Sequence, residues 1–237
     1  MFRARPSLHS DRGKLVGLVL GSVFIGLYTT VWISGGPDAV SGFYLRFGLS
    51  RKGIMEGEWW QWFTYSWLHG GWLHVISNSL GAAVVVPQVQ RMLGSRGVVQ
   101  NMVGGVLLGG LANVMVSSEQ VLVGASGGIT ALMLLVTTLA PEARLKFVRL
   151  SAGNLGKGFM IASAVLLVLS PGLQLPLASR VGNSLESFFG PGLFQVAHAC
   201  HLGGGFFGWA MARWILRPRP GLDQIKAARS KREGGLD

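Results

Sequence analysis

A serine in a glycine-rich turn and a distant histidine are the residues of this chain best suited to chemistry. Ser126 lies in Gly124-Ala125-Ser126-Gly127, between two apolar stretches, and His201 follows 75 residues later inside another apolar stretch. Polar side chains at membrane depth indicate a functional site by default, because their burial in lipid is unfavourable. A serine that opens a helix, with a distant histidine as base, is an arrangement for nucleophilic catalysis.

Each of these residues also has a structural interpretation. Glycine and serine are common where membrane helices contact one another, and a lone membrane histidine can be a structural hydrogen-bonding group. Gly204 and Gly208, one turn beyond His201, form a small-xxx-small pair whose expected use is packing. In the functional interpretation, the same pair lets the histidine helix approach the serine helix closely enough for a hydrogen bond.

Other polar residues accompany the serine and the histidine. His74 and Asn78 are four residues apart and share one helix face, from which both can donate hydrogen bonds to a developing oxyanion. His69 lies off that face and is interpreted as structural. His198 lies three residues before His201, near its face, and either tunes it or fills space.

Composition predicts a single all-α domain embedded in a membrane. The chain has 237 residues, of which 49% are hydrophobic and only 13% charged. Its six apolar runs of membrane length are 14–34, 72–90, 97–117, 126–140, 158–175 and 196–216. The first run is too long for a signal peptide and has no small-residue cleavage site, so it is interpreted as a retained helix. The expected organisation is a basic tail at 1–13, a six-helix domain at 14–216 and a second basic tail at 217–237.

The distribution of the +11 net charge predicts an orientation. With the N-terminus in the cytoplasm, 17 of the 21 lysines and arginines fall on the inner side, as the positive-inside rule requires. The four outside are Arg46, Arg51, Lys52 and Arg180. Both termini are therefore expected in the cytoplasm, with the basic tail from Arg217 to Arg232 against anionic lipid rather than nucleic acid.

This orientation gathers the unusual polar groups near the outer surface, because the helices at 72, 126 and 196 all begin there. The serine helix, from Ser126 to Ala140, spans roughly 22 Å at 1.5 Å per residue, against about 30 Å for the hydrocarbon core. Its start must then lie inside the membrane, with residues 117–125 dipping down to meet it. Irregular backbone at that depth needs surrounding protein or a water-filled cavity.

Aromatic residues gather in the long connection before the second helix. Five of the eight tryptophans lie within 59–72, which is typical of an interfacial belt. The connection from Gly35 to Gly71 is too long for a simple loop, so part of it is expected in the outer leaflet.

Together these segments resemble the rhomboid family of intramembrane serine proteases. Three motifs carry the resemblance, which covers about 55–212: the segment from Glu58 to Thr64 followed by Trp67 to Asn78, then Gly124-Ala125-Ser126-Gly127, then His201-Leu202-Gly203-Gly204 with Gly208. The resemblance implies a six-helix rhomboid-like bundle with no cofactor and no metal. Its substrates would be transmembrane segments of membrane proteins, partly unwound near the outer face.

The resemblance also implies a role for each residue of the site. Ser126 would be the nucleophile and His201 the general base, while His74, Asn78 and the Ser126 backbone N–H would form the oxyanion hole. The supporting residues would be Gly124, Gly127, Gly204, Gly208, His69 and His198.

Two residues depart from the family pattern. Gln61 stands where the family usually has arginine, which affects loop anchoring or lipid contact rather than the chemistry. Thr130 stands where the family commonly has an aromatic ring beside the histidine, so the imidazole would be held less firmly or by another group.

Three other classes of function fit the sequence less well. A catalytically inactive relative that binds transmembrane clients is the main alternative, although both Ser126 and His201 are present. A metalloprotease is disfavoured because the chain has no HExxH motif and no carboxylate beside His69 or His74. A transporter or channel would show midplane charges or paired broken helices.

The compact layout of the predicted helices favours a bacterial plasma membrane. The sequence does not predict an oligomeric state.

Overall fold

The computed structural model describes residues 8–117, 121–144, 150–190 and 192–218, which are almost entirely helical. Two isolated bridges, Leu49 with Leu122 and Arg144 with Ser151, are the non-helical pairings recorded among these residues. The expected all-α class is confirmed.

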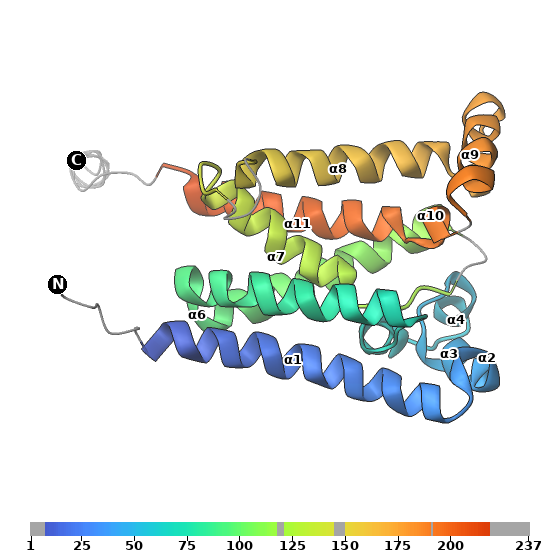
Figure 1. Ribbon diagram of the computed structural model, residues 1–237, viewed down its shortest axis with the longest axis horizontal. Helices are drawn as coiled ribbons and strands as arrows, with labels where there is room; N and C mark the ends of the chain where they lie inside the picture. Colours follow the sequence, from blue (N-terminus) through green and yellow to red (C-terminus); the bar gives the residue numbers. More distant parts are fainter. Residues whose placement is uncertain (1–7, 118–120, 145–149, 191, 219–237) are drawn as a thin grey trace, which may run out of the picture.

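Among the described residues, five helices that run along one axis build the bundle (Figure 1). They are α1 (Leu8–Ile33), α6 (Trp72–Val116), α7 (Ser126–Leu139), α8 (Ala152–Leu169) and α11 (His198–Leu216). Gly94 interrupts α6 with φ +70° and ψ −175°, a conformation open to glycine. The segments 72–93 and 95–116 therefore fold back on one another, where the sequence predicts separate helices at 72–90 and 97–117.

Short helices fill the two long connections. Between α1 and α6 lie α2 (Gly36–Ala39), α3 (Ser41–Phe47), α4 (Arg51–Met55), α5 (Gln61–Thr64) and the 3₁₀ helix η1 (Tyr65–Trp67). Between α8 and α11 lie the 3₁₀ helix η2 (Pro171–Leu173), α9 (Pro176–Phe189) and α10 (Gly192–Gln195). Both connections lie at the same end of the bundle (Figure 1).

Three stretches among the described helices are long and apolar enough to cross a membrane: Gly13–Ile33, Trp72–Val116 and Ala152–Leu169. The helix α7 is apolar but shorter. These stretches fit an integral membrane protein, while the predicted six spans and the cytoplasmic termini stay predictions.

The helices differ from the predicted apolar runs at two places. The helix α1 begins at Leu8, while its apolar stretch, Gly13–Ile33, agrees with the predicted run at 14–34. The fifth, expected at 158–175, is α8 at Ala152–Leu169. It begins early because the Ser151 hydroxyl accepts a hydrogen bond from the Asn154 N–H at 3.3 Å, and it ends before Pro171, which starts η2.

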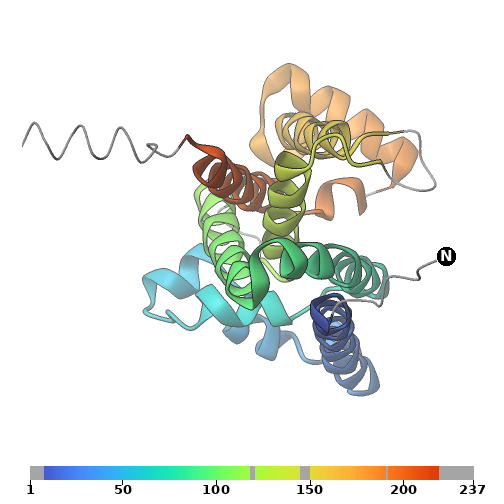
Figure 2. The same cartoon turned by 90° about the vertical axis from the view of Figure 1, so that its left-hand side faces the viewer.

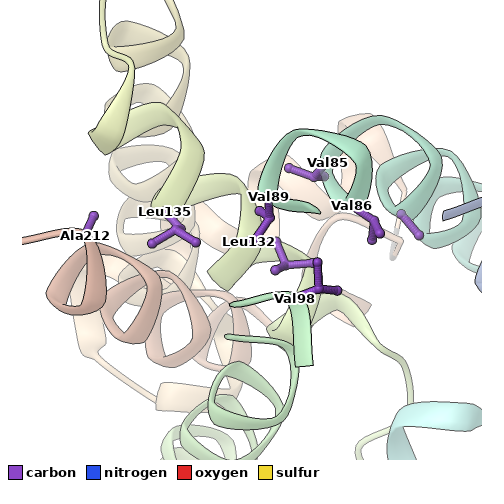
Figure 3. Packing of buried hydrophobic residues seen from close by; sticks show 8 residues of the cluster. Val85, Val86, Val89, Val98, Leu132, Leu135 and Ala212 are labelled. Carbon is purple, nitrogen blue, oxygen red and sulfur yellow. The ribbon is translucent and has the colours of Figure 1, made fainter. Parts of the chain in front are cut away.

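The helix α7 lies at the centre, in contact with α6, α8 and α11, while α1 packs on α6 (Figure 2). Between them lies a core of aliphatic side chains from α6, α7 and α11 (Figure 3). It comprises Ala82, Val85, Val86, Val89, Val98, Leu132, Leu135 and Ala212. Close packing of this kind holds helices together in lipid, where little hydrophobic driving force acts between them.

Candidate active site

Ser126 is the first residue of α7. The Ile129 N–H donates to the Ala125 carbonyl oxygen at 3.1 Å, so the N–H groups of Ser126, Gly127 and Gly128 precede the intrahelical hydrogen bonds. The positive end of the helix dipole lies at the same place. The turn therefore places backbone donors next to the Ser126 hydroxyl group, with the buried Cys200 thiol against Ser126 and the Gly127 N–H.

The backbone leading into Ser126 is held by the preceding connection. Leu122 and Leu49 exchange hydrogen bonds of 2.8 and 2.9 Å, and the Gly124 N–H donates to the Tyr65 carbonyl oxygen at 2.9 Å. Gly124 has φ +114°, which favours glycine. Of the segment 117–125 that is expected to dip inward, 118–120 lie outside the described residues.

His74 and Asn78 of α6 lie beside this turn. A Cβ atom on Gly124 would lie 2.5 Å from His74 Nε2 and 3.5 Å from Asn78 Nδ2, so only glycine leaves room for them. Asn78 is buried, and its Nδ2 makes no hydrogen bond with the described residues. Both side chains thus converge on the backbone two residues before Ser126.

The helices α7 and α11 run side by side in the same direction. A Cβ atom on Gly204 would overlap the Gly127 carbonyl oxygen, and one on Gly208 would overlap the Ala131 carbonyl oxygen. Gly204 and Gly208, the small-xxx-small pair, therefore pack α11 closely against α7. This contact also places His201, one turn before Gly204, near the start of α7. No hydrogen bond joins the Ser126 hydroxyl to His201 in the part of the chain described; such bonds in unliganded sites often tighten only when substrate binds.

An aromatic ring on α8, rather than on the serine helix, lies beside His201. The Phe159 ring of α8 lies 5.4 Å from the His201 ring, centroid to centroid, with an interplanar angle of 41°. Thr130, at the position where the family commonly has a ring, is buried near Gly205 instead. The ring that contacts the imidazole therefore comes from α8 and not from the position of Thr130.

His198 lies beside His201, with 6.2 Å between ring centroids. Its Nε2 contacts the Leu193 carbonyl oxygen at 3.0 Å, and the side chain is buried. This contact ties α10 to the start of α11. A structural role for His198 fits this position.

His69, in the connection before α6, packs between two rings. Its centroid lies 5.2 Å from that of Phe24 and 5.1 Å from that of His74. Burial and then the neighbouring His74 lower the pKa of His69 to about 4. A neutral His69 therefore buttresses His74.

Gln61, the other departure from the family pattern, anchors the connection before α6. Its Nε2 donates to Glu58 Oε2 at 2.6 Å and to the Leu45 carbonyl oxygen at 3.2 Å, while its Oε1 accepts from the Ser50 N–H at 3.0 Å. The side chain is fully buried. The sequence indicates only that the arginine is absent, because the backbone groups that Gln61 contacts, at Leu45 and Ser50, are distant in sequence.

A cavity of about 480 Å³ opens at the same end of the bundle. It lies between the end of α6, η2, α10 and the start of α11. Its polar lining includes Asn113, Ser117, Ser170, Gln174 and His198. Within the described residues, no three His, Cys, Asp or Glu side chains are grouped to hold a metal ion.

Comparison with known proteins agrees with this architecture. The family model of the Rhomboid domain matches residues 56–218. A Bacillus subtilis (strain 168) protein named "Putative rhomboid protease YdcA" is 32% identical over 96 residues, which is 40% of this chain and 45% of that relative. The chain belongs to the rhomboid family, a family of intramembrane proteases, and it is an integral membrane protein.

Proposed function

We propose that this protein is a serine endopeptidase that cleaves transmembrane segments of membrane proteins near the outer membrane face. The observation that carries the proposal is the backbone contact between Gly204 and Gly127, which brings the starts of α7 and α11 together. Ser126 precedes one partner of that contact by one residue, and His201 precedes the other by three.

In this mechanism His201 takes the proton from the Ser126 hydroxyl as its oxygen attacks the scissile carbonyl carbon. The carbonyl oxygen becomes an oxyanion, which the Ser126 N–H, His74 and Asn78 stabilise. The C–N bond breaks, and the leaving amine takes the proton from His201. Water then attacks the acyl carbon and loses its proton to His201. The ester C–O bond breaks, the Ser126 oxygen takes that proton from His201, and the second product leaves with a carboxyl group.

The surroundings of the site support this assignment of donors. The unpaired Asn78 Nδ2 faces Gly124, two residues before Ser126, and the His69 ring packs against His74. The polar cavity beside His198 offers a space for water on the same side. The corresponding topology is six spans with both termini in the cytoplasm of a bacterium.

The test is cleavage of a model transmembrane substrate in liposomes, combined with labelling by a fluorophosphonate probe. Wild type should cleave and label, and Ser126→Ala should do neither while unfolding at the same temperature. Asn78→Ala and His74→Ala should still label but slowly, since losing one oxyanion donor lowers rates by about 10²–10³ in soluble serine proteases. Unimpaired cleavage by Ser126→Ala would overturn the proposal.

The second candidate, an inactive relative that binds transmembrane clients, predicts another outcome. Wild type would then capture the model segment without cutting it and would not react with the probe. Zinc chelators should leave wild type unaffected; inhibition that added zinc reverses would indicate a metalloprotease.

A further inference from the structure

The helix α9 lies across the end of the bundle. It runs nearly perpendicular to α8 and α11, whereas the other long helices run along the bundle axis (Figure 1). It lies at the end where α11 and the candidate site begin. In a membrane protein whose long helices cross the bilayer, such a helix lies in the plane of the membrane surface.

The exposed surface of α9 divides into an apolar and a polar side. Leu177, Val181 and Phe188 are 77%, 50% and 82% exposed, and their spacing of four and seven residues puts them on one stripe. Exposed Arg180, Asn183 and Ser187 lie on another side. Three exposed apolar side chains on one face of an amphipathic helix are typical of binding to an interface.

The orientation of α9 is fixed by its contact with α8. A Cβ atom on Gly182 would overlap the Leu169 carbonyl oxygen at the end of α8. The Gly182 side of α9 therefore faces the bundle. This contact leaves the stripe of Leu177, Val181 and Phe188 exposed.

The stripe continues a lipid-facing surface of α8. Ile161, Val165 and Val168 are 64%, 49% and 50% exposed and lie on one face of α8. Since α8 is a candidate membrane span, hydrocarbon covers this face. Val168 directly precedes Leu169, whose carbonyl oxygen contacts Gly182 of α9. The exposed apolar surface therefore passes from α8, the spanning helix, to α9, the transverse helix.

We propose that α9 is an in-plane membrane helix that inserts Leu177, Val181 and Phe188 into the acyl-chain boundary of the leaflet on the side of the candidate site. Arg180 reaches the lipid phosphates, as long basic side chains do at interfaces. The partner is phospholipid. The binding depends on burial of apolar side chains and is independent of proteolysis.

The test is the depth of spin labels in nanodiscs of phosphatidylcholine and phosphatidylglycerol. Labels are attached to Leu177→Cys and Phe188→Cys, with Asn183→Cys and Ser187→Cys as matched controls on the polar side. Cys200 is fully buried, and unsubstituted protein carried through the labelling reports any background. Collisions with oxygen should dominate at 177 and 188, and collisions with a water-soluble nickel chelate at 183 and 187.

Equal nickel accessibility at 188 and 183 would show that α9 stands in water and would overturn the proposal. Spin–spin broadening at 188 that is lost when labelled protein is diluted with unlabelled protein would assign the face to a second copy instead. Because the labels report depth directly, these outcomes do not depend on whether the protein cleaves substrates.

Discussion

The Phe159 ring of α8 lies 5.4 Å from the imidazole of His201 in α11. The candidate base is thus supported by a different helix from the one that carries Ser126. In the family pattern the ring would come from the position of Thr130, on the serine helix itself. The imidazole can therefore keep its orientation only while α8 stays packed against α11.

Loss of the Phe159 ring should lower turnover without abolishing it. We expect Phe159→Ala to reduce kcat by on the order of 10–10², because a base displaced by about an ångström is much less effective. KM should change little, and Phe159→Tyr should restore most activity. Phe206→Ala, which removes an exposed ring from α11, is the control. If Phe159 has only a structural role, Phe159→Ala will lower the unfolding temperature. The pH profile of kcat, measured on the protein that remains folded, will then be the same as that of wild type.

Ser126 and His201 should behave as one unit. We expect Ser126→Ala, His201→Ala and the double variant to have the same residual activity, because either loss removes the step that both residues perform. Single-turnover cleavage in liposomes measures this. If His198→Ala abolishes cleavage and His201→Ala is tolerated, the base is His198.

The close contact of α7 and α11 makes a sharp prediction for stability. Gly204→Ala places a methyl group against the Gly127 carbonyl oxygen, so it should lower the unfolding temperature and the activity together. Gly158→Ala in α8 is the matched control, since a Cβ there meets no atom within 4 Å. The control should be neutral or slightly stabilising, because alanine favours helix by about 1 kcal/mol over glycine. Equal stability of the two variants would refute the contact.

Replacing the buried Gln61 amide should loosen the connection before α6. In Gln61→Met, the part-buried Ser50 N–H and Leu45 carbonyl lose their partner; an unsatisfied group typically costs about 1–3 kcal/mol when buried and less when water can reach it. We expect a lower unfolding temperature and faster limited proteolysis within residues 45–61. Gln100→Met, at an exposed position of α6, should change neither.

The sequence predicted those features that depend on local pattern. Apolar run lengths located the long helices, and the turn opening at Ser126 agrees with the observed start of α7. The sequence did not predict residues that act through distant partners. Nothing in the spacing of Phe159 places it beside His201, and the backbone partners of Gln61, at Leu45 and Ser50, lie in an earlier segment. The amphipathic α9 was overlooked because its apolar side chains alternate with polar ones and form no run of membrane length.

His69 gives a pH dependence whose sign follows from its lowered pKa. The folded protein binds its proton only below about pH 4, whereas an unfolded histidine binds it below about 6.5. Between these values the unfolded state holds more protons, so stability is fully present above about pH 6.5 and falls as the pH drops toward 4.

The largest effect of this one group is about 3 kcal/mol, from 1.36 kcal/mol for each pH unit of the shift. Thermal unfolding in detergent across this range should show wild type losing more stability than His69→Phe, in which no proton binds at that position. Both proteins keep the remaining histidines, so the difference between their slopes reports His69 together with its effect on the neighbouring His74. Parallel slopes would mean that His69 binds a proton equally in the folded and unfolded states. Water would then reach the His69 ring in the folded protein despite its packing against His74.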